Sequence, residues 1–135
     1  MRDVELIELA VELVNRGGLF LLDSPVGAME LHGDDFRLSG SNSWLAVYHD
    51  SEPGGEARSH LHLKTGVLKA ARIVEEDGAT PYLGFWENLD CAGEAALRVY
   101  FPSWYDWARD KALIDANVAY CARWIEAHGR EFRFD

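Results

Sequence analysis

The sequence predicts an α+β fold in which an antiparallel meander sheet of about six to eight strands is flanked by an N-terminal and a C-terminal helix. Apolar residues recur at helical spacing at both ends of the chain. Between them, residues 19–101 form short β-like runs, and none of the separating turns is long enough to hold a crossover helix. With 135 residues, of which 48% are hydrophobic, we expect a single α+β domain over residues 1–135.

The two helices are predicted from capping residues and periodicity. Asp3 can cap a helix over residues 4–16, which Gly17 and Gly18 would end. Near the C-terminus, Ser103 with Asp106 resembles a capping box, and the apolar spacing continues to residue 129. This predicts a second helix of about 25 residues, in one piece or two.

The predicted strands lie between turn residues rich in Gly, Pro, Asp and Ser. They cover residues 19–22, 28–31, 36–38, 44–49, 58–64, 67–75, 81–87 and 94–101. Because consecutive strands are joined by short turns, we expect neighbouring strands to pair as hairpins.

The charge balance is acidic, with 23 Asp and Glu against 13 Lys and Arg and a formal net charge of -10. Nucleic acid is therefore not the expected partner, because phosphate backbones need clustered cations. No apolar run approaches the roughly 20 residues of a membrane span, and acidic residues interrupt the N-terminus, so we expect no membrane partner and a cytoplasmic location. Cys91 and Cys121 are expected to be free thiols. No nucleophile or phosphate-loop motif is present, and whether the chain is an enzyme stays open.

A basic row interrupts this acidic composition. Arg58, His60, His62 and Lys64 alternate with smaller or apolar residues, so a strand would place all four on one face. Such a row fits an anionic ligand or the axial ligation of haem iron by His60 or His62. A metal site on His60 and His62 would need a third ligand, for which His49 is a candidate. The alternative is a solvated face on which both histidines are bystanders.

A second group of side chains is aromatic. Tyr82, Gly84 and Trp86 share one face of their predicted strand, and Arg98 and Tyr100 share a face of the next. They could border a groove in which Gly84 leaves room for a flat ligand. Alternatively the C-terminal helix covers this surface with its tryptophans, which are Trp104, Trp107 and Trp124.

These segments in order resemble the sheet of the haem-utilisation carrier proteins. The resemblance covers about 45 residues and follows strand order: Ser59-His60-Leu61-His62-Leu63, then residues 67–74, Leu83-Gly84-Phe85-Trp86-Glu87, a turn with Gly93, and residues 96–101. It implies a curved antiparallel sheet that holds haem in a cleft, often in a dimer. It also implies His60 and His62 as axial-ligand candidates and Arg98 as a propionate partner. The sequence departs from the family after the last strand, where Pro102-Ser103-Trp104-Tyr105 replaces a charged stretch.

The resulting hypothesis is a haem-carrier-like protein that holds an anionic planar ligand in a cleft on the sheet. His60 or His62 would ligate haem iron, and the other predicted ligand-binding residues are Arg58, Lys64, Arg98, Tyr82, Trp86 and Tyr100. A different hypothesis is a non-catalytic interaction or regulatory module that binds a partner protein or forms a homodimer through the sheet face. A small metal-dependent enzyme using His49, His60 and His62 is a third.

Overall fold

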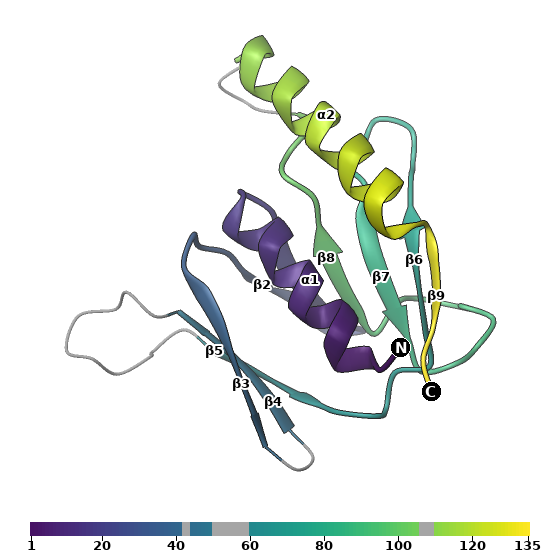
Figure 1. Cartoon of the computed structure of the whole chain (residues 1–135). Coiled ribbons are helices and arrows are strands. Elements are labelled where there is room, and N and C mark those ends of the chain that lie inside the picture. Colours follow the sequence, from purple (N-terminus) through teal and green to yellow (C-terminus); the bar gives the residue numbers. More distant parts are fainter. Residues whose placement is uncertain (42–43, 50–59, 106–109) are drawn as a thin grey trace.

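The computed structural model describes residues 1–41, 44–49, 60–105 and 110–135, except for the side chains of Ser41 and His49. In these residues two helices flank antiparallel strands, so the α+β prediction is confirmed (Figure 1). The elements in order are α1 (Asp3–Asn15), β1 (Leu19–Ser24), β2 (Gly27–Leu31), β3 (Phe36–Ser41), β4 (Trp44–His49), β5 (His60–Lys64), β6 (Ala70–Val74), β7 (Tyr82–Trp86), β8 (Leu97–Tyr100), α2 (Lys111–His128) and β9 (Glu131–Arg133).

The strands are divided between two sheets. Six of them form a sheet in the order β2-β1-β8-β7-β6-β9, and three form a second sheet in the order β3-β4-β5. Hairpin pairing of consecutive strands accounts for most of these contacts, but β1 pairs with β8, which is about 80 residues later, and β9 pairs with β6. Pairs between strands distant in sequence therefore complete the larger sheet.

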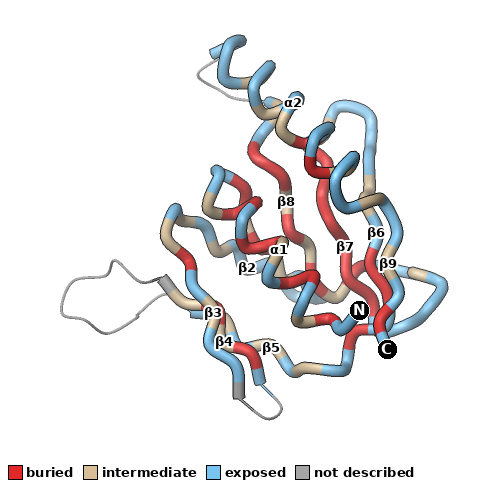
Figure 2. The backbone as a smooth tube through the Cα atoms, viewed as in Figure 1, coloured by how far each residue is buried: buried red, intermediate tan, exposed pale blue. Residues whose placement is uncertain are grey.

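The core lies between the inner faces of the two sheets and α1. Phe20 of β1 and Phe36 of β3 contact each other edge to face, with ring centroids 6.1 Å apart. Leu83 and Phe85 of β7 have no exposed surface, and Val47 of β4 has none either. Figure 2 shows β7 buried along its length, whereas buried and half-buried residues alternate along β8. Burial of apolar side chains from both sheets and α1 in one cluster is what fixes the two sheets relative to each other.

The helix α1 supplies the largest helical part of that core. Its apolar residues recur at spacings of three and four, so they form one stripe that packs against β1, β3 and β8. The Asn15 side chain donates to the carbonyl of Phe36 and accepts from its N–H, at 3.1 and 2.7 Å. The chain then turns through Gly17, whose φ of 112° favours glycine.

The helix α2 begins later than the sequence predicts. Its N-cap is Asp110, whose side chain accepts from the N–H of Leu113 at 3.2 Å. A helix start at Ser103 is wrong, because the Ser103 hydroxyl instead donates to the carbonyl of Tyr105 at 2.7 Å in a non-helical turn. Asp106 and Trp107, which belonged to that prediction, lie outside the described residues.

Candidate functional site

The outer face of the three-stranded sheet carries most of the predicted basic row. Along β5, exposed His60, His62 and Lys64 alternate with half-buried Leu61 and Leu63, as a half-buried strand requires. In the register Trp44 is opposite Lys64, Ala46 opposite His62, and Tyr48 opposite His60. Arg58 lies outside the described residues. The described residues of this outer face are Arg37, Ser39, Trp44, Ala46, Tyr48, His60, His62 and Lys64.

The side chains at the centre of this face touch one another. The rings of His60 and His62 lie edge to face with centroids 4.9 Å apart, and those of His62 and Trp44 are 6.4 Å apart. The Lys64 ammonium lies 5.5 Å from the centre of the Trp44 ring, within the range of a cation–π interaction. Trp44 is nevertheless 42% exposed. The result is a solvent-facing patch that combines hydrogen-bonding imidazoles, one fixed cation and a large aromatic ring.

The border of this patch is also cationic. Arg37 of β3 forms an ion pair with Asp35 at 3.4 Å, and its side chain keeps 60% of its surface exposed. Because Arg37 is opposite Tyr48 in the register, it lies two strands away from His60 on the same face. We refer below to Trp44, Tyr48, His60, His62 and Lys64 as the histidine face.

The histidine face offers two nitrogen ligands to a metal but no third. Among the described residues no group of three or more His, Cys, Asp or Glu side chains lies close enough together to hold a metal ion. Position 49 is opposite buried Phe36 and is one residue out of phase with the strand positions that face His60 and His62. The His49 side chain itself lies outside the described residues. Two imidazoles alone suit axial ligation of an iron already held by a cofactor better than a protein-built zinc cage.

The predicted aromatic group lies on the outer face of the six-stranded sheet. Tyr82 is opposite Tyr100 and Gly84 opposite Arg98, so these residues and Trp86 share one face, as their spacing predicts. The Arg98 guanidinium lies 4.8 Å from the centre of the Tyr82 ring and donates to the Tyr100 hydroxyl at 3.3 Å. That hydrogen bond raises the pKa of Arg98 above its ordinary value, and burial raises the pKa of Tyr82. Arg98 also pairs with Glu94.

The space above Gly84 is filled by the protein itself. A Cβ at this position would lie 2.6 Å from two ring atoms of Trp86 and 3.3 Å from the Cβ of Ala95. The Trp86 indole donates to the carbonyl of Gly93 at 3.0 Å, and Arg72 lies 5.2 Å from the centre of one of its rings. Trp86 is therefore only 3% exposed. A flat ligand cannot stack on this face unless Trp86 first moves.

The helix α2 does not cover this aromatic surface. Its Trp124 packs edge to face on Phe101, with ring centroids 5.5 Å apart, and near Phe132. Phe132 is opposite Ala71, which in turn is opposite Phe85, so Trp124 lies on the inner face of the sheet. Trp104 lines a cavity beside α2.

The two predicted groups are thus on different sheets. The inner faces of both sheets contribute to one core, so the histidine face and the Tyr82–Arg98 face point outward from it on separate sides. The structure does not bring His60, His62 and Lys64 together with Tyr82, Trp86, Arg98 and Tyr100 in one cleft. The aromatic neighbours of the histidines are instead Trp44 and Tyr48. Sequence reasoning missed both, although their place on the preceding strand was a usable signal.

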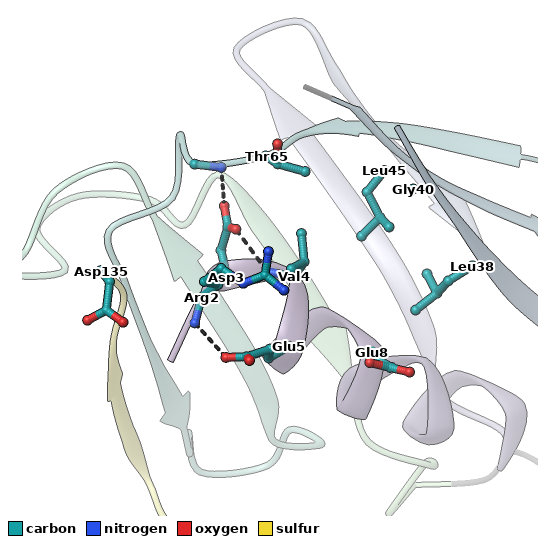
Figure 3. A pocket seen from close by; sticks show the side chains of 11 residues that line it. Arg2, Asp3, Val4, Glu5, Glu8, Leu38, Gly40, Leu45, Thr65 and Asp135 are labelled. Atoms are coloured by element: carbon teal, nitrogen blue, oxygen red, sulfur yellow. Dashed lines mark hydrogen bonds between the residues drawn. The ribbon is translucent and has the colours of Figure 1, made fainter. Parts of the chain in front are cut away.

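A cavity of about 500 Å³ opens between the start of α1 and the inner side of the three-stranded sheet (Figure 3). Sequence reasoning did not predict it, because it is built from residues distant in sequence. Asp3 is only 4% exposed, and its carboxylate accepts from the N–H of Val4 and of Gly66, at 2.8 and 2.7 Å. Glu5 accepts from the N–H of Arg2 at 2.7 Å. Asp3 and Glu5 thus already accept hydrogen bonds from backbone N–H groups of the protein. Their role in this cavity is structural, because their hydrogen-bonding capacity is used within the fold.

No known protein family and no curated protein matches this sequence. In the described part of the chain, no helix is both long enough and apolar enough to cross a membrane.

Proposed function

We propose that the protein binds a small anionic planar molecule on the histidine face, and that haem is the ligand to test first. The observation that carries this proposal is the mutual contact of Trp44, His62, His60 and Lys64 on a surface that stays open to solvent. Haem is chosen because of the resemblance to the haem-utilisation carriers. The histidine face offers imidazole nitrogens, an aromatic ring and a cation, which are the groups that bind haem in proteins.

Each side chain has a defined part in this proposal. An imidazole nitrogen of His60 or His62 would ligate the iron. The Trp44 ring covers part of the macrocycle, since aromatic stacking on a flat conjugated ligand buries a large apolar area. Lys64 at the end of the strand pairs with a carboxylate of the ligand. Arg37 on β3, at the opposite edge of the same sheet face, adds a second positive charge.

Electrostatics favour this face over others. The chain carries a net charge of -10, which repels anions over much of its surface. Beside the histidine face, Asp35 already pairs with Arg37, whereas Glu30 lines a small cavity together with His60. Arg98 is less suitable, because it is held between Tyr82, Tyr100 and Glu94. The Tyr82–Arg98 face is therefore not part of the proposed binding site.

The test is a titration of the full chain with haemin, followed by the Soret band. We expect a shifted band that is lost in the double variant His60→Ala/His62→Ala and retained in His32→Ala, which removes an exposed histidine from another part of the chain. A parallel titration with iron-free protoporphyrin measures the contribution of Trp44 and Lys64 alone. An unshifted Soret band, or a shift equal in the double variant and in His32→Ala, contradicts the proposal.

A second candidate function uses the same face to bind a partner protein or a second copy of the chain. An exposed tryptophan surrounded by polar side chains is typical of the residues that dominate protein–protein affinity. If the face forms a homodimer, sedimentation at micromolar concentration gives the mass of two chains, and Trp44→Ala reduces it to one. If haemin binds and the mass measured by sedimentation is the same with and without Trp44→Ala, the small-molecule function is favoured.

A further inference from the structure

The helix α2 is far less buried than α1. In α1 seven of 13 residues are buried, whereas in α2 only Cys121 and Trp124 of 18 residues are buried. In Figure 1 the first half of α2 projects beyond the ends of the strands, and Figure 2 shows that half as mostly exposed. A helix in a globular protein gains most of its stability from packing an apolar face. No described element covers α2 along much of its length.

An apolar stripe runs along one flank of α2, on which Val118 and Ala122 are exposed and Ile114 and Ile125 are half-buried. Ile114, Val118, Ala122 and Ile125 are spaced by four, four and three residues, so they lie on one side of the helix. Val118, at the middle, is 39% exposed. The stripe is about 17 Å long at 1.5 Å per residue. It borders a cavity of about 280 Å³, which Trp104 and Arg130 also line.

One charged residue lies near each end of this stripe. Lys111 precedes Val118 by seven residues and Glu126 follows it by eight, and both lie on the same side of the helix as Val118. Within α2 the cations Lys111 and Arg123 balance the carboxylates Asp115 and Glu126. The helix is therefore locally neutral in a chain whose net charge is -10. Self-association through this helix avoids the repulsion that most of the surface would impose.

We infer that two copies of the chain pair through α2, with the helices antiparallel and crossing near Val118. In this arrangement Lys111 of each copy meets Glu126 of the other, and the apolar stripes cover each other. A parallel pair would place Lys111 on Lys111 and Glu126 on Glu126, which is unfavourable, and would also align the helix dipoles. The antiparallel pair is thus the arrangement that the charges select.

Two ion pairs among the described residues lie beside the stripe, and neither opposes this pairing. Glu75 and Arg130 form an ion pair at 3.2 Å at the end of the cavity. Asp115 pairs with Lys111 at 2.6 Å in the same helix, and both side chains are more than half exposed. Lys111 can therefore exchange Asp115 for Glu126 of the second copy at little cost, since ion pairs between exposed side chains contribute little to stability.

Sedimentation of the full chain across a range of concentrations tests the inference. We expect a dimer that is weakened at least about tenfold by Lys111→Glu or by Glu126→Lys. The double variant Lys111→Glu/Glu126→Lys exchanges the charges and should restore it. Arg123→Glu, which makes the same charge change as Lys111→Glu away from the stripe, should leave the dimer unchanged. A single-chain mass at about 100 μM, or a dimer equally stable in all four variants, overturns the inference.

Covalent trapping gives a second and independent readout. In a Cys91→Ser background, Val118→Cys places a thiol near the two-fold axis, and mild oxidation should give a disulfide-linked dimer. Ala116→Cys lies on the opposite side of the helix and should not cross-link. Equal cross-linking of both variants contradicts pairing through this stripe. Because none of these substitutions touches the histidine face, the outcome is separable from that of the haemin titration.

Discussion

The Asp3 carboxylate accepts a hydrogen bond of 2.7 Å from the backbone N–H of Gly66, 63 residues further along the chain. It also accepts from the N–H of Val4 at 2.8 Å, so one buried side chain ties the first turn of α1 to the turn after β5. The bond connects the core helix to the strand that carries the histidines. A change at Asp3 therefore affects how the three-stranded sheet is held.

Replacing Asp3 tests the strength of this tie. We expect Asp3→Ala to lower the free energy of unfolding by about 1–3 kcal/mol, because it leaves the Gly66 N–H without its acceptor. Asp3→Asn keeps one acceptor oxygen and should lose less. Urea denaturation measures both values. Equal midpoints for the alanine variant and the unmodified protein would mean that water replaces the carboxylate without cost.

The close approach of Trp86 to Gly84 gives a second prediction. Gly84→Ala would place its Cβ 2.6 Å from the indole, so the ring must shift and strain its hydrogen bond to the carbonyl of Gly93. We expect a destabilisation of about 1–3 kcal/mol, as for other overpacked sites. Gly40→Ala is a matched control on β3, since its Cβ would have no neighbour closer than 4.0 Å. Equal thermal midpoints for the two variants would contradict this packing.

Substitution of Trp44 is expected to affect ligand binding much more than stability. Because it is 42% exposed and outside the core, Trp44→Ala should change the free energy of unfolding by less than about 1 kcal/mol. The same substitution should weaken the binding of protoporphyrin, whereas Trp44→Phe keeps an aromatic surface and should retain part of it. Chemical denaturation and porphyrin fluorescence measure the two effects. Loss of folding together with binding would assign Trp44 a structural role instead.

Tyr120 makes stability sensitive to alkaline pH. Burial raises the pKa of Tyr120 to about 12, and its hydroxyl is buried without a hydrogen-bond partner among the described residues. Between about pH 10 and about pH 12 the unfolded chain releases a proton that the folded chain keeps, so the free energy of unfolding falls as the pH rises. Tyr120→Phe removes this dependence and keeps the ring beneath Arg16.

The check for Tyr120 compares urea midpoints at pH 8 and pH 11. The phenylalanine variant should lose less stability between these values than the unmodified protein does. Tyr105→Phe makes the same chemical change at a side chain that is 55% exposed and serves as the control. A phenylalanine variant with the same pH dependence would show that other groups cause the alkaline loss.

Local patterns in the sequence were sufficient to predict most elements. The apolar stripe and the Gly17-Gly18 pair predicted α1 to within one residue at each end, and the eight predicted strands correspond to β1 to β8. The alternation along β5 also placed His60, His62 and Lys64 on one exposed face. These properties depend on neighbouring residues, so a single sequence contains them.

Long-range pairing could not be predicted in the same way. The pairing of β1 with β8, the division into two sheets and the three-residue strand β9 depend on which apolar faces pack together. The division into two sheets decides which side chains share the candidate site. It puts Lys64 and Arg98 on different sheets, and the pairing of β4 with β5 places Trp44 beside the histidines. The filling of the space over Gly84 by Trp86 depends on a side-chain rotamer, which strand alternation does not predict.

The unequal exposure of the tryptophans provides the protein with its own optical reporter. Trp86 and Trp124 are each 3% exposed, whereas Trp44 meets solvent on the histidine face. A collisional quencher such as iodide therefore reaches Trp44 before these two indoles. Any molecule that settles on the histidine face would shield this emission, so the surface can be surveyed for ligands by fluorescence without attaching a dye.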